Sequence, residues 1–215
     1  MCSQIMNDFI PSLATLIAAF AGSWSAFYLQ DSKERRKEKI QQVSSINQAL
    51  FSLVRQYQSL ENIKIEIAPF KEDKLRYINL PALSTNEFQD IKVKIETLNF
   101  LLDSTDPNLL MAITLEQERF EMALKTIQLR SEFHIRELQT AWTDLGIENG
   151  ALLKLGDTRT RLGTRIADTL INLTDQLYKH VYESSDSTLA TLNRFYTYAK
   201  QTFPKEKFIK IADSA

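Results

Sequence analysis

The stretch PNLLMAITLEQERFEMALKTIQLRSEFHIRELQTAWTDLG, residues 107–146, decides the fold class. Its apolar positions alternate steps of three and four, so one helix face recurs every seven residues. This predicted buried seam contains Leu110, Ile113, Gln117, Phe120, Leu124, Ile127, Ser131, His134, Leu138, Ala141 and Leu145. Asp106 suits the N-cap, Pro107 the first helical turn and Gly146 the C-terminal stop. The pattern predicts one helix of roughly 39 residues, about 58 Å long.

Upstream of this stretch, a helical period of apolar residues runs from Ile40 to Ile67 and stops before Pro69. Residues 69–84 contain two prolines and no sustained period, so they are predicted to be a connector. Ser84 or Thr85 is then expected to cap a helix that ends near Asp103. Its inward face would contain Phe88, Ile91, Ile95, Leu98 and Leu102.

Downstream, a second long helix is expected over residues 157–183, and the polar stretch SSDS, residues 184–187, is predicted to interrupt it. A last helix follows, so the bundle covers residues 85–203 and a tail covers residues 204–215. The inward positions are Leu162, Ile166, Leu170, Leu173, Leu177, Val181, Leu189, Leu192, Phe195, Tyr196 and Ala199. An all-α, elongated helical bundle or antiparallel coiled coil is the predicted architecture.

Composition supports a folded chain with little sheet-forming character. The chain has 215 residues, of which 44% are hydrophobic, and its formal net charge of −1 does not suit a disordered polyelectrolyte. Five glycines and five prolines are few for a chain of this length. Because Cys2 is its single cysteine, an intramolecular disulfide and a cysteine-based zinc site are excluded, which suits a reducing compartment.

Residues 9–29 form an apolar run whose one ionisable side chain is Tyr28. A helix of that length spans roughly the 30 Å hydrocarbon layer of a bilayer, so the run predicts a transmembrane helix. Ala19-Phe20-Ala21 resembles a signal-peptide cleavage site. No lysine or arginine precedes the run, however, and the run continues beyond this site, so a retained span is favoured over a removable leader.

A block of basic residues follows the apolar run. It comprises Lys33, Arg35, Arg36, Lys37 and Lys39, within a predicted juxtamembrane and stalk segment of residues 30–68. Since residues 1–8 contain no basic side chain, the charge asymmetry predicts a short extracytoplasmic N-terminus and a cytoplasmic body at a bacterial inner membrane. The same block could also bind lipid headgroups or nucleic acid.

Small residues recur at every fourth position of the apolar run, at Ala14, Ala18, Gly22 and Ala26. Such a row lets two membrane helices approach closely, so it predicts a self-association face. The alternative is chance, because alanine and glycine are common in membrane helices. No stoichiometry follows from the row.

Motifs for nucleotide binding or hydrolysis are absent, and the two histidines, His134 and His180, fall on different predicted helices. We therefore expect no catalytic residue, metal or cofactor. His134 lies on the predicted seam, where it could set helix register or act as a pH-sensitive or partner-sensitive switch.

The stretch GDTRTRLGTR, residues 156–165, places Arg161 and Arg165 on one face of a predicted helix, with Arg159 nearby. Guanidinium groups beside a helix N-terminus can hold a phosphate or carboxylate, or contact a partner. The alternative is that the Asp157 carboxylate occupies the place of such an anion at the helix N-terminus and that the arginines pair with glutamates. With 26 basic and 27 acidic residues, the chain has no general nucleic-acid footprint.

The full layout, with NQALFSLVRQYQSL (47–60), DPNLL (106–110) and FPKEKF (203–208), resembles small single-pass bacterial membrane proteins. Some proteins of this layout are effectors of anti-phage operons, including retrons. The resemblance implies a cytoplasmic ribonucleoprotein partner that contains a reverse transcriptase, and membrane damage on triggering. The expected function is a membrane-disrupting effector held in check by cytoplasmic partners. The alternatives are a non-lytic scaffold or signalling anchor that recruits a cytoplasmic partner, and an enzyme with an unrecognised site.

Overall fold

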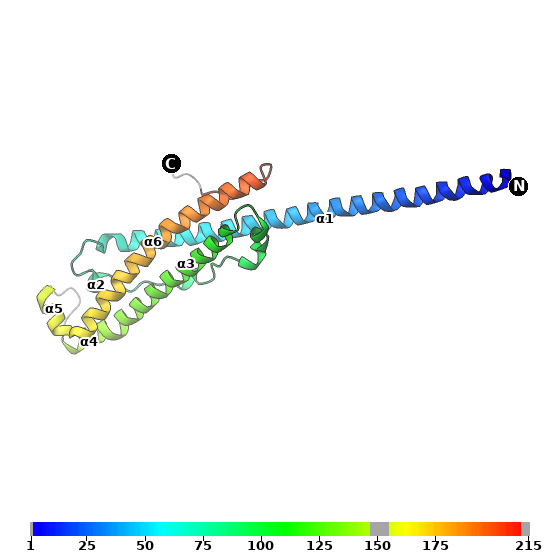
Figure 1. The fold of residues 1–215 in the computed structure, drawn as a ribbon. Helices are drawn as coiled ribbons and strands as arrows, with labels where there is room; N and C mark the ends of the chain where they lie inside the picture. The colour runs from blue at the N-terminus through cyan, green and yellow to red at the C-terminus, as the bar shows by residue number, and fades with distance from the viewer. Residues whose placement is uncertain (1, 147–154, 212–215) are drawn as a thin grey trace. The chain divides into compact units, whose positions relative to one another are not determined.

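The computed structural model describes the backbone of residues 2–146 and 155–211, and the side chains of residues 20, 22–146 and 159–211. These ranges contain helices, turns and extended segments but no β-strand, which confirms the all-α fold class (Figure 1). The chain divides into two units, Met1–Ser44 and Ser45–Ala215. Helix α1 (Cys2–Ile67) contributes residues to both.

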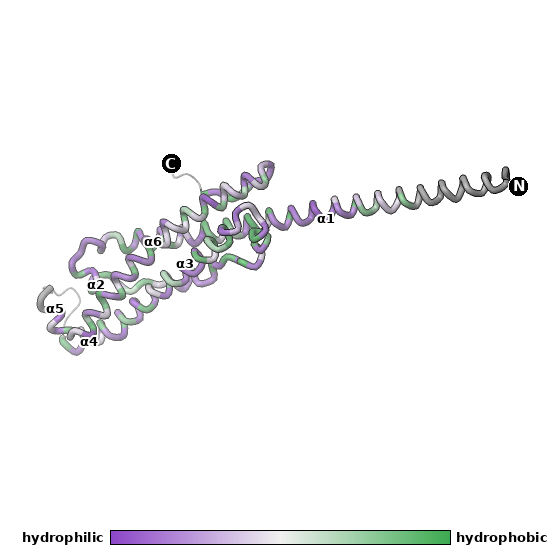
Figure 2. Tube along the Cα trace, viewed as in Figure 1, coloured by the Kyte–Doolittle hydropathy of each residue, from purple (hydrophilic) through white to green (hydrophobic). Residues whose placement is uncertain are grey.

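The first unit consists of the N-terminal part of α1. Most of its described apolar side chains, including Phe20, Trp24 and Phe27, are exposed. The sequence then becomes hydrophilic along the helix (Figure 2). Within the described residues, none of the helices combines the length and the hydropathy that a membrane crossing requires. Of the predicted transmembrane helix, residues 9–29, the side chains of residues 9–19 and 21 lie outside the described set.

In the second unit, the end of α1 packs with α3 (Asn108–Phe133) and α6 (Thr164–Thr202). Helices α3 and α6 are antiparallel, because Thr126 contacts His180 while Glu137, further along the chain, contacts Arg165. Their shared core consists of Leu60, Ile63, Ile67, Leu80, Ile91, Phe120, Ala123, Leu124, Ile127, Leu177, Tyr178 and Val181. Burial of one such Leu, Ile or Phe side chain contributes about 1.5–3 kcal/mol. The antiparallel helical bundle is thus confirmed.

The long helix predicted after Pro107 forms as one continuous rod. Helix α3 passes through a π-helical turn, η4 (His134–Leu138), into α4 (Gln139–Asp144). The rod ends at Gly146, whose φ of 63° suits a glycine. The buried seam is confirmed over most of its length, although Leu145 is 46% exposed. The predicted N-cap role of Asp106 is wrong: its carboxylate accepts hydrogen bonds from Arg194 at 2.7 Å, and no side chain caps α3.

The helix predicted over residues 85–103 does not form. After η1 (Ala68–Phe70) and α2 (Arg76–Asn79), the chain has two 3₁₀ segments, η2 (Asn86–Phe88) and η3 (Ile95–Asp103), with irregular backbone in residues 91–94. The stretch IKVKI, residues 91–95, explains the difference. Its β-branched apolar residues alternate with lysines, so Ile91 and Val93 are buried on one side and the lysines are exposed.

The helix boundaries near residues 157 and 184 also differ from the prediction. Helix α5 (Leu155–Leu162) ends at Gly163, whose φ of 79° breaks the chain, and α6 then runs without interruption through residues 184–187. The serines there do not cap a helix, because their hydroxyl groups donate hydrogen bonds to other helices. Ser184 donates to the Arg119 carbonyl at 3.4 Å, and Ser187 donates to Glu116 at 2.6 Å.

Candidate functional site

The predicted membrane face is described only in part. Gly22 and Ala26 are exposed on α1, and a Cβ placed on Gly22 would meet no atom within 4 Å. The side chains of Ala14 and Ala18 lie outside the described set. Self-association through this row therefore stays a prediction.

The basic block lies wholly on the exposed surface of α1. Lys33, Arg35, Arg36, Lys37 and Lys39 are all exposed, so they are accessible to headgroups or a partner. Arg35 pairs with Asp31 through Nε and Oδ2 at 2.9 Å. Because both side chains are well exposed, this pair adds little to stability and does not occupy the block.

The three arginines predicted to contact an anion do not lie on one helix. Gly163 separates Arg161 on α5 from Arg165 on α6, so the predicted shared helical face is wrong. Arg159 pairs with Asp168 at 2.8 Å, and Arg165 pairs with Glu137 at 3.1 Å. Two of the three guanidinium groups thus already have carboxylate partners, and their anion contact stays a prediction.

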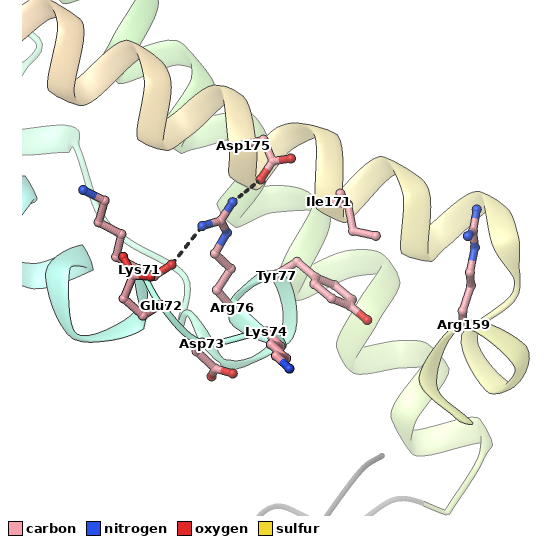
Figure 3. A pocket seen from close by; sticks show the side chains of 9 residues that line it. All are labelled: Lys71, Glu72, Asp73, Lys74, Arg76, Tyr77, Arg159, Ile171 and Asp175. Carbon is pink, nitrogen blue, oxygen red and sulfur yellow. Dashed lines mark hydrogen bonds and ion pairs between the residues drawn. The ribbon is translucent and has the colours of Figure 1, made fainter. Parts of the chain in front are cut away.

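Arg159 also lines a cavity of about 560 Å³ at one end of α6 (Figure 3). Arg76 spans the opposite side, where it binds Asp175 and the Lys71 carbonyl, each at 2.8 Å. The cavity is lined by Lys71, Glu72, Asp73, Lys74, Arg76, Tyr77, Arg159, Ile171 and Asp175. Since the lining mixes four basic and three acidic side chains, it gives no strong preference for an anion.

A fully buried arginine organises the segment that follows α1. Arg130 on α3 is 0% exposed, and its guanidinium donates to the backbone carbonyls of Tyr77, Leu80 and Pro81. These carbonyls lie at the C-terminal end of α2, where a cation is favourable. Burial lowers the pKa of Arg130 to about 10, so the side chain remains charged at neutral pH.

Further polar side chains of α3 satisfy the backbone of the linking segment, which we define as residues 68–107. The Gln117 Oε1 atom accepts from the Val93 N–H at 2.9 Å and from the Gln56 side chain at 2.7 Å. The Ser131 hydroxyl accepts from the Leu83 N–H at 2.9 Å. Helix α3 therefore supplies hydrogen bonds that the irregular parts of the linking segment cannot make by themselves.

His134 is buried at the start of the π-helical turn. Burial, together with the nearby Arg130 charge, lowers the pKa of His134 to about 4, so its ring is neutral at physiological pH. The ring meets Trp142 edge to face at 6.3 Å between centroids, and its Nδ1 atom has no hydrogen-bond partner in the described part of the chain. His180 lies elsewhere, with Nδ1 at 2.9 Å from the Thr126 hydroxyl.

A buried carboxylate joins α3 to α6. Glu116 is 2% exposed and accepts hydrogen bonds from Ser187 at 2.6 Å, Thr188 at 3.3 Å and Thr191 at 3.4 Å. Arg119 completes the arrangement through an ion pair at 2.8 Å. This role was not predicted from the sequence, although Glu116 and Arg130 both lie seven residues from the buried Ala123.

Across residues whose side chains are described, no cluster of three or more His, Cys, Asp or Glu residues is arranged to hold a metal ion. Comparison with protein-family models, with curated proteins and with solved structures gave no significant match.

Proposed function

We propose that the chain is a membrane-anchored helical scaffold, with residues 9–29 in a bacterial inner membrane and residues 45–215 recruiting a cytoplasmic partner. One observation supports this proposal above others. The single element α1 contains the apolar run, then the basic block, and then body core residues such as Ile46, Leu50 and Leu53. A membrane helix followed by basic residues is typical of a protein retained with its body inside the cell.

The anchor is tested by placing acidic residues in the apolar run. An aspartate near the centre of a membrane helix costs about 2.5–3.5 kcal/mol, and one near its end costs less. Phe20 lies near the centre of residues 9–29 and Phe27 near their end, so Phe20→Asp supplies most of the effect in the double variant Phe20→Asp/Phe27→Asp, which should move the chain from the membrane fraction to the soluble fraction. Ile40→Asp is the matched control, because Ile40 is an exposed apolar residue of α1 beyond the basic block. An unchanged membrane fraction for the double variant would argue against the anchor.

The orientation is tested with the native cysteine. Since Cys2 is the chain's single cysteine, a membrane-impermeant maleimide added to intact cells with a permeabilised outer membrane should label it. In the variant Cys2→Ser/Lys205→Cys, the exposed tail position should be labelled only after lysis. The reverse pattern would contradict a cytoplasmic body.

A second candidate is a membrane-disrupting effector of anti-phage defence, held inactive by a cytoplasmic protein or ribonucleoprotein. The row Ala14, Ala18, Gly22 and Ala26 supports it, because small residues let several spans cluster. Expression without the partner should then depolarise the membrane. Gly22→Ile should prevent this by separating the helices, whereas Gly22→Ala should not. Cells that stay polarised at high expression would leave the scaffold as the better proposal.

A further inference from the structure

Helix α3 carries a row of exposed residues on the face opposite its buried seam. We name this row the outer seam, and it consists of Met111, Leu115, Glu118, Met122, Lys125 and Leu129. Steps of three and four keep these positions on one helical face. Four of them are large apolar side chains with exposed fractions of 62% (Met111), 40% (Leu115), 55% (Met122) and 47% (Leu129).

Hollows flank the outer seam on both sides. One, of about 720 Å³, lies between α3 and α6 and is lined by Leu115, Glu118 and Met122 among others. The other, of about 430 Å³, lies toward the linking segment and is lined by Lys125 and Leu129 among others. A ridge between two grooves is the surface that a second helix packs against.

The order of charges along the outer seam identifies the helix that would fit. Glu118 lies four residues before Met122 and Lys125 three residues after it, while Leu115 and Leu129 each lie seven residues away. Read in the opposite direction, the row L-E-M-K-L becomes L-K-M-E-L. An antiparallel copy centred on Met122 therefore places Leu115 of one copy opposite Leu129 of the other. It also places Glu118 opposite Lys125, with an offset along the helix of about one residue, or about 1.5 Å.

The two charges are available for such pairing. Neither Glu118 nor Lys125 makes an ion pair in the portion of the chain whose side chains are described, and both are exposed. A parallel copy would place Glu118 beside Glu118 and Lys125 beside Lys125, which is unfavourable. The charges thus select the antiparallel arrangement, in which both partners use the same patch, as in a two-fold interface.

We propose that two copies of this chain associate through the outer seam of α3, antiparallel and related by a two-fold axis beside Met122. The inference concerns residues within the unit Ser45–Ala215 and does not depend on the partner proposed above. In this unit the end of α1 runs in the same direction as α3, because Gln56 contacts Gln117 while Ile67, further along α1, contacts Tyr178 in the core that also contains Ile127. A two-fold axis across α3 makes the two α1 segments antiparallel, so this dimer is an alternative to anchoring both copies side by side in one bilayer.

Cysteine cross-linking tests the geometry in the full chain, extracted into detergent so that a shared bilayer does not fix the direction of α1. With Cys2→Ser as background, Met122→Cys should form a disulfide-linked dimer on mild oxidation, because the two copies of residue 122 meet at the axis. Met111→Cys is the matched control. It is also exposed on the outer seam, but its two copies would lie about 33 Å apart, so it should not cross-link. Efficient cross-linking at residue 111 and none at residue 122 would overturn the proposal.

Charge reversal separates this interface from association through the membrane segment. Glu118→Lys or Lys125→Glu alone turns both attractive pairs into repulsive ones and should weaken the residue-122 dimer roughly tenfold. The double variant Glu118→Lys/Lys125→Glu restores opposite charges and should recover dimerisation. Circular dichroism should be unchanged, since both residues are exposed. The proposal that the partner is a second copy would be rejected if the single variants have no effect or if the double variant dimerises no better than the single ones. A monomer that binds a different protein through the outer seam would also reject it.

Discussion

The linking segment and helix α6 both pack on α3, but they are held in different ways. Helix α6 satisfies its own backbone hydrogen bonds, and it packs on α3 through apolar side chains such as Leu177 and through side-chain hydrogen bonds such as those to Glu116. The linking segment consists of short helical turns and irregular stretches, and its backbone groups bind side chains of Gln117, Arg130 and Ser131. A helix needs a matching apolar face, whereas an irregular segment needs polar partners placed at particular positions.

Removal of Arg130 is expected to have the largest effect, because it should loosen the linking segment while α6 stays attached to α3. Arg130→Met leaves the buried carbonyls of Tyr77 and Leu80, and the part-buried carbonyl of Pro81, without their donor, and should lower the free energy of unfolding by about 3–5 kcal/mol. Trypsin should then cleave faster after Lys92 and Lys94 while α6 stays protected in hydrogen exchange. Arg136→Met, which changes an exposed arginine on the same rod, is the control. Equal loss of protection in α6 and the linking segment would contradict separate modes of attachment.

Acid should have the next largest effect. Because the pKa of folded His134 is about 4, the unfolded chain binds a proton between about pH 6.5 and pH 4 that the folded chain does not. The stabilising contribution is therefore complete above pH 6.5 and decreases as pH falls, with a total loss of up to about 3 kcal/mol. Denaturant unfolding at a series of pH values measures this slope.

Replacement of His134 measures how much of the loss of stability in acid is due to this side chain. His134→Phe should give a shallower dependence of unfolding free energy on pH between 6.5 and 4, while His180→Gln keeps the original slope. If both variants have the same slope as the parent chain, His134 does not account for the acid sensitivity.

The smallest effect is expected at the α3–α6 contact. Ser187→Ala favours helix locally but removes the 2.6 Å donor to buried Glu116, so it should cost about 1–2 kcal/mol by thermal unfolding. Thr197→Ala is the control on the same helix, because its hydroxyl binds only the Asn193 carbonyl one turn earlier. Ser187→Ala with stability equal to or above that of Thr197→Ala would show that the bond to Glu116 contributes nothing.

The apolar period was sufficient to predict the parts of the fold in which helices meet. The buried seam of α3 follows it closely, because burial of one face is what positions a helix. In α1 the same period predicted a helix through Ile46, Leu50 and Leu53 but placed it in a stalk outside the predicted bundle, whereas these side chains are buried in the body. The helix break predicted at residues 184–187 was wrong because a run of serines is typical of a helix cap. The hydrogen-bond partners of Ser184 and Ser187 on α3 are distant in the sequence and could not be known from it. The alternation in residues 91–95 was visible in the sequence but was outweighed by longer helical spacing around it.

Less of the candidate site could be predicted. Arg130 and Glu116 are charged, and charged residues usually mark an exposed face, so their burial emerges only when the chain brings carbonyls and hydroxyls to them. The outer seam was readable from spacing and charge order. It was overlooked because the buried seam on the same helix has the stronger period.

The contacts of Arg130 also have a consequence for how such a chain can diverge. Its guanidinium binds only backbone carbonyls of residues 77, 80 and 81, which every amino acid provides. Substitutions at these three positions therefore keep the bonds to Arg130 as long as the backbone path is kept, although the buried side chains of Tyr77 and Leu80 still have to fit the core. A substitution at residue 130, by contrast, removes all three bonds at once.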